Sequence, residues 1–133
     1  MPLQWSVSHP ARLVLIVAKG EVQAGEMVEL LAGLDRDKAR PYRKIADIDG
    51  LATRFSDEQV RALASAVRAR EQATMEVGPI AIIARNPEVV RMARLFIEQA
   101  EMARPIQLFD EQHLARRWLE RVEAVLNLSK VAP

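Results

Sequence analysis

The sequence predicts an α/β domain built on a mixed sheet, with the element order β-β-α-β-α-β-α-β-α. Three observations carry this prediction: two apolar strands open the chain across a short turn, apolar stripes at helical spacing follow, and short β-branched runs separate those stripes. Alternating strands and helices are typical of a mainly parallel sheet with right-handed crossovers. The opening pair adds one antiparallel strand, because a short link cannot make a crossover.

The two opening strands differ in their patterns. Residues 3–8 alternate apolar and polar side chains, which predicts a half-buried strand. Residues 13–18 read Leu-Val-Leu-Ile-Val-Ala, a continuous apolar run that is typical of a strand covered on both faces. The residues between them, His9 to Arg12, form a turn, so we expect an antiparallel hairpin.

The chain then changes to helical spacing. Met27, Leu30, Leu31 and Leu34 follow the i, i+3, i+4, i+7 pattern of an amphipathic helix. A third strand is predicted over residues 42–48, where basic residues dilute the apolar run.

Clear start signals mark the second and third helices. Ser56 and Gln59 fit a capping box, so a second helix is expected to begin at Ser56. Residues 80–84 form a core strand, and Asn86 followed by proline predicts the start of a third helix. Residues 105–109 form a short last strand.

The last helix and the domain limits follow from the end of the chain. Asp110 is predicted to cap a fourth helix whose inner stripe includes Leu114 and Trp118. We expect a single domain over residues 3–126 and a C-terminal tail over 127–133. A chain of 133 residues is the usual size of one domain.

Composition excludes several function classes. Lys and Arg total 19 against 18 Asp and Glu, so a net charge of +1 gives no field that would draw in nucleic acid. The absence of cysteine excludes thiol chemistry and cysteine metal sites, and with only His9 and His113 we expect neither a metal nor a cofactor. The longest apolar run, 13–18, is far shorter than the roughly 20 residues of a membrane span. The start of the chain is not a signal peptide, so the expected location is the cytoplasm.

The opening hairpin, the later strand–helix units and the closing run PIQLFDEQHLARRWLE resemble the SpoIIAA-like group of bacterial proteins, which have the STAS/SEC14-type fold. The resemblance covers residues 3–122. Its closing signature is carried by Phe109, Asp110, Ala115, Trp118 and Leu119. On the STAS side the resemblance implies a regulatory module that binds a protein partner. On the SEC14 side it implies a binder of small molecules or lipids.

The resemblance also implies a phosphorylated serine at a helix start, within an Asp-Ser-Ser/Thr-Gly-Leu-like motif. Residues 47–57 read DIDGLATRFSD, so Ser56 holds the helix-start position without the paired hydroxyls or the following Gly-Leu. Ser56 is therefore a candidate phosphosite, and a phosphate there would be favoured by the helix dipole. The alternative is a plain N-cap.

Ligands of open α/β sheets bind beyond the carboxyl ends of the strands, where helix N-termini point. The candidate ligand- or partner-binding residues at that edge are Asp47, Asp49, Thr53, Arg54, Phe55, Ser56, Arg85, Asn86 and Asp110.

Two groups within this set have alternative interpretations. Asp47 and Asp49 precede a glycine as in Mg²⁺-dependent phosphoryl-transfer sites, or they serve as turn residues and caps. Arg85, beside Asn86, either binds an anion at the third helix or pairs with Glu88 or another carboxylate.

The basic residues of the second and third helices, which include Arg61 and Arg70, alternate with acidic ones and predict a solvated face. Because no accessory lobe remains to close over a substrate, we expect a non-enzymatic interaction module that binds a protein partner or a small ligand near the start of the second helix. A small-molecule or lipid binder is the alternative, and a phosphoryl-transfer enzyme using Asp47 and Asp49 is a third. The unguarded first strand, residues 3–8, predicts a homodimer.

Overall fold

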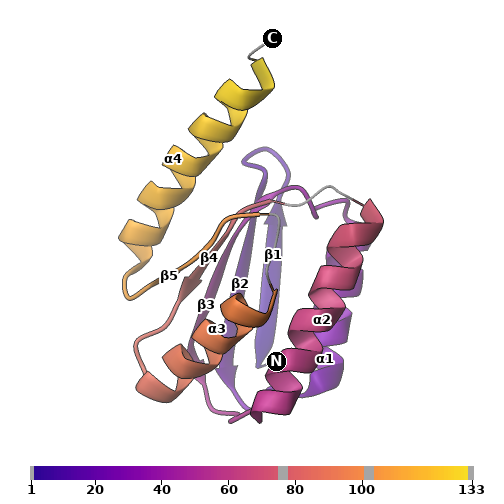
Figure 1. Cartoon of the computed structure of the whole chain (residues 1–133), viewed down its shortest axis with the longest axis vertical. Helices are drawn as coiled ribbons and strands as arrows, with labels where there is room; N and C mark the ends of the chain where they lie inside the picture. The colour runs from indigo at the N-terminus through magenta and orange to yellow at the C-terminus, as the bar shows by residue number, and fades with distance from the viewer. Residues whose placement is uncertain (1, 75–77, 101–103, 132–133) are drawn as a thin grey trace.

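The computed structural model describes residues 2–74, 78–100 and 104–131, and only the helical backbone of 71–74 and 125–131. Within these residues a five-stranded sheet is combined with four helices (Figure 1). The elements are β1 (Leu3–Ser8), β2 (Leu13–Gly20), α1 (Ala24–Arg36), β3 (Arg43–Leu51), α2 (Asp57–Thr74), β4 (Ile80–Ile83), α3 (Pro87–Ala100), β5 (Ile106–Phe109) and α4 (Gln112–Val131). The predicted element order is confirmed.

The strands lie in the order β1-β2-β3-β4-β5. β1 and β2 pair antiparallel, whereas β2 to β5 pair parallel, so the predicted mixed sheet with an opening hairpin is confirmed. The hairpin closes through His9, whose carbonyl accepts the Arg12 N–H at 3.2 Å. β1 lies at one edge of the sheet, as the sequence predicts.

The two faces of the sheet are covered by different helices. Val14, Lys44 and Ile80 are register partners and point to one face, which α1, α2 and α3 cover (Figure 1). Their neighbours Ile45 and Ala81 point to the other face, where α4 packs. Successive parallel strands always lie farther from β1, so right-handed crossovers place the three connecting helices on one face.

The face under α4 forms a closed core. Its members are all at most 3% exposed: Ile45, Ala81, Ile83, Ala115 and Leu119. Trp118 and Phe109 add a tilted ring contact with centroids 5.6 Å apart at the margin of this core. Trp118 is half-buried and packs against this core, which agrees with its predicted place on the inner stripe of the last helix.

The connecting helices are anchored unevenly. α1 packs on β1, where the Trp5 ring lies so close to Gly33 that a Cβ at position 33 would come within 2.8 Å of it. α2 packs mainly along α3. In the described part of the chain α1 and α2 share few backbone contacts, so a seam separates these two helices.

Two predicted strand boundaries are wrong. The second strand continues past Ala18 to Gly20, and the third runs to Leu51 instead of ending at Ile48. The register of β2 shifts between Val17 and Lys19, and beyond this shift the longer β2 pairs with residues 50 and 51 of β3. As a consequence Asp47 and Asp49 lie inside β3 and not in the loop after it.

The last helix also differs from the prediction. α4 begins at Gln112, and the Glu111 carbonyl accepts its first backbone hydrogen bond, from Ala115 at 3.3 Å. Asp110 therefore precedes the capping position and does not occupy it. The helix continues to Val131, so the backbone of residues 127–131 is helical where a tail is expected, and this end runs past the sheet (Figure 1).

We predict that Leu119→Ala lowers the free energy of unfolding by about 3 kcal/mol, because this side chain is 1% exposed and its removal leaves a cavity between α4 and the sheet. Val28→Ala on α1 is the control, since Val28 is 66% exposed and should change stability by less than about 0.5 kcal/mol. Urea titration measures both. If both substitutions lowered the free energy of unfolding by the same small amount, the packing of α4 on the sheet would be contradicted.

Candidate functional site

Asp49 joins β3 to the start of α3. One of its carboxylate oxygens accepts the backbone N–H groups of Arg85 at 2.6 Å and of Asn86 at 3.0 Å. These two hydrogen bonds, the Arg85 one foremost, hold the pKa of Asp49 below its usual range. Asn86 in turn accepts the Glu88 N–H at 3.0 Å, so the predicted N-cap of the third helix is confirmed.

Asp47 faces a different environment from Asp49. It lies in β3 opposite Val17 and Ile83, and its carboxylate accepts the Asp49 N–H at 3.2 Å. In the described residues there is no group of three or more His, Cys, Asp or Glu side chains that could hold a metal ion. The hydrogen bonds of Asp47 and Asp49 match the interpretation as turn and capping carboxylates.

Thr53 and Arg54 hold neighbouring segments together. The Thr53 hydroxyl accepts the Val22 N–H at 2.8 Å and so ties the end of β3 to the connection after β2. The Arg54 guanidinium donates to the Leu51 carbonyl at 2.9 Å and lies 2.5 Å from Glu88. The sequence left Glu88 as a partner for Arg85, but the salt bridge that it forms is with Arg54.

The start of α2 has the predicted capping box. The Ser56 N–H donates to the Gln59 side chain at 2.8 Å, and the Gln59 N–H donates to the Ser56 hydroxyl at 3.1 Å. Ser56 is exposed, and its phosphorylation stays a prediction. Phe55, just before it, is half-buried and packs against the hydrophobic core instead of facing solvent.

Arg85 and Asp110 are exposed residues of the predicted edge. The Arg85 side chain is 69% exposed and its nearest ion-pair contact, to Asp49, is 3.9 Å long. Asp110 is exposed and follows β5 directly. The structure thus brings Asp47, Asp49, Arg85 and Asn86 together around the start of α3, and most of the polar groups at this edge are engaged in caps and ion pairs.

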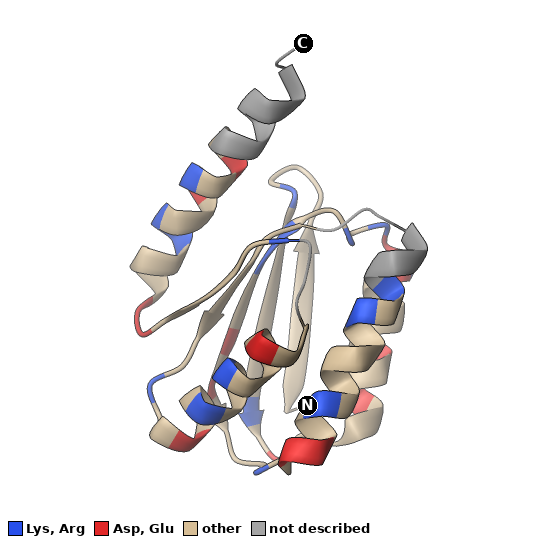
Figure 2. Cartoon of the chain, in the orientation of Figure 1, with Lys and Arg blue, Asp and Glu red and all other residues tan. Residues whose placement is uncertain are grey.

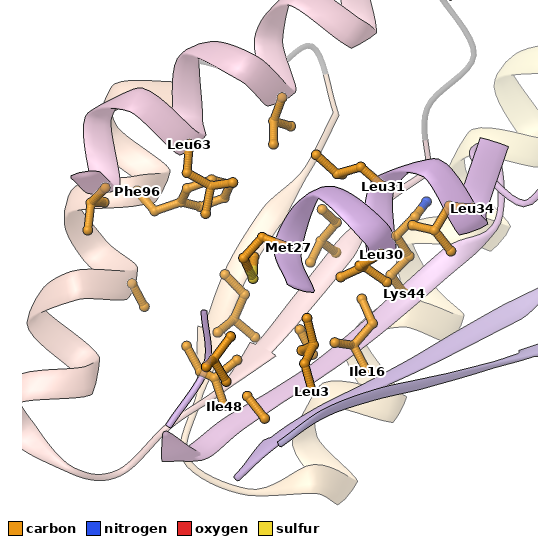
Figure 3. Close-up of a pocket in the computed structure, with 18 of the residues that line it drawn as sticks. Leu3, Ile16, Met27, Leu30, Leu31, Leu34, Lys44, Ile48, Leu63 and Phe96 are labelled. Atoms are coloured by element: carbon orange, nitrogen blue, oxygen red, sulfur yellow. The ribbon is translucent and has the colours of Figure 1, made fainter. Parts of the chain in front are cut away.

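A cavity that sequence reasoning did not find lies beneath the connecting helices. It has a volume of about 230 Å³ and is lined by α1, α2, α3 and the sheet (Figure 3). Met27 and Leu31 of α1 face Leu63 of α2 and Phe96 of α3 across it (Figure 3). Its walls are almost wholly apolar, and Phe55 lines one end.

Several sheet residues beside this space are less buried than the core beneath α4. Four side chains in the middle of the sheet on the cavity face are only partly buried: Ile16, Ala46, Ile48 and Ile80. On the α4 face of β3 and β4, Ile45, Ala81 and Ile83 are buried, whereas Leu13 and Leu15 of β2 are only partly buried there. At these positions of β3 and β4, the α4 face of the sheet is therefore the more completely buried of the two.

The end of the cavity opposite Phe55 is basic. Lys44, on β3, is 4% exposed, and its ammonium group donates to the carbonyls of Arg40 and Tyr42, both at 2.7 Å. Arg40, Arg70 and Arg104 also line this end. Figure 2 shows basic residues toward the end of α2 and acidic residues at its start, which lies at the opposite end of the sheet.

Asp35 joins the basic end to the helix seam. Its carboxylate pairs with Arg40 through one oxygen and with Arg70 through the other, and Arg70 also donates to the Leu31 carbonyl at 2.8 Å. Desolvation would raise the pKa of Asp35, but hydrogen bonds from both arginines and their charges outweigh it and lower that pKa. Arg70, expected on a solvated face, thus links α2 to α1.

One sequence signal could have pointed to this cavity. In β3 the inward positions carry Lys44 and Ala46, a cation and a small side chain, where a core strand usually carries large apolar residues. From the sequence alone, Lys44 together with Arg43 indicates only a diluted strand, and Ala46 gives no signal. Their neighbours in space come from distant segments, so the cavity has no contiguous pattern in the sequence.

Comparisons with protein-family models, curated proteins and solved structures give no match for this chain. The resemblance to the SpoIIAA-like group stays a prediction. Among the described residues no helix combines the length and the apolar character needed to cross a bilayer.

Asp49→Ala should lower the free energy of unfolding by about 1 kcal/mol at neutral pH, as loss of a helix-start cap usually does. The pKa of Asp49 is lower in the folded state than its ordinary value of 3.8. The ionised carboxylate therefore stabilises the fold at pH values above 3.8, and this stabilisation is lost as the pH falls through the folded-state pKa. The difference from the parent protein should therefore shrink below about pH 3.8. Urea titrations across this range measure it, with Asp110→Ala as an exposed-carboxylate control. A pH-independent difference would argue against the ionised cap.

Proposed function

We propose that this chain is a non-enzymatic binding protein for a small apolar or amphipathic molecule, which lies in the cavity between the sheet and α1, α2 and α3. The observation that carries this proposal is the cavity itself: about 230 Å³ of space with apolar walls, in a domain whose other sheet face is closely packed. Small-molecule sites are concave and mainly apolar, with a few convergent polar groups, and this cavity has that character.

The energetic cost of such a cavity supports an occupant. Apolar space that side chains leave unfilled costs stability, because the residues that line it lose packing contacts. The total stability of a small domain is only about 5–15 kcal/mol. A ligand that restores the missing contacts recovers a large part of this cost, so binding and folding stability are expected to be strongly linked.

The finer fold assignment belongs to this proposal. A sheet in the order β1-β2-β3-β4-β5, with an opening antiparallel hairpin and three connecting helices on one face, supports a SpoIIAA-like fold of the STAS/SEC14 type. The SEC14 side of that resemblance implies a small-molecule or lipid binder, which agrees with the cavity. The regulatory module at the start of α2, the phosphoryl-transfer enzyme, the homodimer and the cytoplasmic location stay predictions that no specific observation favours.

The direct test is titration with a neutral, environment-sensitive dye such as N-phenyl-1-naphthylamine. Saturable fluorescence enhancement at a stoichiometry of one dye per chain, together with a rise in the melting temperature at saturating dye, is the expected result. An absence of saturable binding of this dye and of neutral alcohols of varied chain length would overturn the proposed function.

Ala46→Ile is predicted to stabilise the protein by about 1 kcal/mol and to weaken dye binding at least about tenfold, because the added carbons fill the cavity. The matched control is Ala81→Ile, an alanine on the neighbouring strand whose side chain points to the closed face. There the extra volume should cost about 1–3 kcal/mol and leave dye binding by the folded protein unchanged. Equal destabilisation by both substitutions, measured by urea titration, would mean that the space beneath the helices is already filled.

A further inference from the structure

We infer that ligands enter and leave the cavity between α1 and α2, and that the ion pair between Asp35 and Arg70 closes this route and sets the rate of exchange. The inference rests on the proposed function and concerns access to the same cavity. Three observations carry it: the separate supports of the two helices, the half-buried apolar side chains along their seam, and the polar contacts at one end of that seam.

Three sides of the cavity are supported by close packing. The sheet forms its floor, and α1 lies so close to β1 that a Cβ at position 33 would come within 2.8 Å of the Trp5 ring. α2 packs along α3 through a core that includes the buried Val60 and Met92. The border between α1 and α2 has few backbone contacts in the described part of the chain, so these two walls can separate while each keeps its own support.

Apolar side chains from both helices lie along the seam. Met27 and Leu31 come from α1, Leu63 and Val67 come from α2, and all four line the cavity while being only half-buried. Figure 3 shows Leu31 and Leu63 on opposite sides of the space. An apolar molecule that passes between the helices therefore stays in contact with apolar surface, which lowers the cost of its passage.

Polar contacts join the two helices at one end of the seam. Arg70 of α2 pairs with Asp35 of α1 and donates a hydrogen bond to the Leu31 carbonyl at 2.8 Å. Asp35 also pairs with Arg40, which follows α1 in the chain and donates to the Arg70 carbonyl at 3.2 Å. Asp35 thus lies at the centre of the contacts that hold the end of α1 to α2.

The ion pair lies where it can open without unfolding either helix. The Asp35 and Arg70 side chains are 37% and 29% exposed, so water reaches both groups when they separate. Partly exposed ion pairs stabilise a fold only weakly, because their charges are hydrated again once the pair is broken. The contact is therefore suited to a border that opens and closes repeatedly while the domain stays folded.

This position predicts an effect on rates and none on affinity. The contact between Asp35 and Arg70 belongs to the closed seam, whether the cavity is empty or filled. Weakening it favours the open form equally in both cases, so the association and dissociation rate constants rise by the same factor. A side chain that held the ligand itself would instead change the ratio of the two rate constants, which is the dissociation constant.

Stopped-flow mixing with N-phenyl-1-naphthylamine tests the inference. Asp35→Asn should raise both rate constants about threefold and leave the dissociation constant of the dye unchanged, because it removes one charge of a partly exposed pair. Asp57→Asn is the matched control, since Asp57 pairs with Arg91 at 2.9 Å and joins the same helix to α3. Its rates should equal those of the parent protein. Sodium chloride should speed exchange in the parent and not in Asp35→Asn, because salt screens the ion pair and the dye is neutral.

A reducible cross-link tests the route itself. The chain has no cysteine, so Asp35→Cys combined with Arg70→Cys places the only thiols of the protein across the seam. Joining them with a short bis-methanethiosulfonate reagent should slow dye exchange below the rate of the parent, and reduction should restore fast exchange. The comparison is made within one double variant, so every other contact that either substitution removes is absent from both states.

The outcomes separate the inference from the proposed function. Unchanged exchange rates in either Asp35→Asn or the cross-linked protein, with the dye bound as tightly as by the parent, would overturn the inference and leave the proposed function standing. A changed dissociation constant with an unchanged association rate in Asp35→Asn would also overturn it, because Asp35 would then act on the bound molecule. Failure of the dye to bind to the parent protein would overturn both.

Discussion

The contacts of Asp35 with Arg40 and Arg70 hold α1 and α2 together over an incompletely filled space. α1 is anchored on β1 through Trp5 and Gly33, and α2 is anchored on α3, so these two helices meet mainly through polar groups at one end of their seam. Between these anchors the helices leave space over part of the sheet, which Met27, Leu31 and Leu63 line. The cavity is the consequence of this arrangement.

The carboxyl edge of the sheet, where ligands of open α/β sheets usually bind, is occupied here by structural contacts. Asp49 and Asn86 satisfy backbone N–H groups at the start of α3, and Thr53 ties two connections together. These contacts fix the positions of α2 and α3, whose inner faces form the far wall of the cavity. The edge therefore shapes the proposed binding site without forming it.

Much of the fold could be predicted from local patterns. The hairpin, the capping box of Ser56 and Gln59, and the N-cap at Asn86 depend on residues within a few positions of each other, and all are present in the structure. The prediction ends β3 too early, because the length of a strand depends on how far its partner strand continues. It also starts α4 too early, because the capping position is set by the carbonyl that accepts the first hydrogen bond of the helix, here that of Glu111.

The sequence by itself determined the order of strands and helices, the mixed character of the sheet and the residues that cap α2 and α3, since these follow from periodicity and short-range hydrogen bonds. Only the tertiary structure decided which face of the sheet is closely packed and where charge meets apolar surface. Lys44, Asp35 and Arg70 come from three different elements, and each has an ordinary interpretation in its own segment. Their common position at one end of a cavity arises from helix placement, which the pattern of any single segment does not specify.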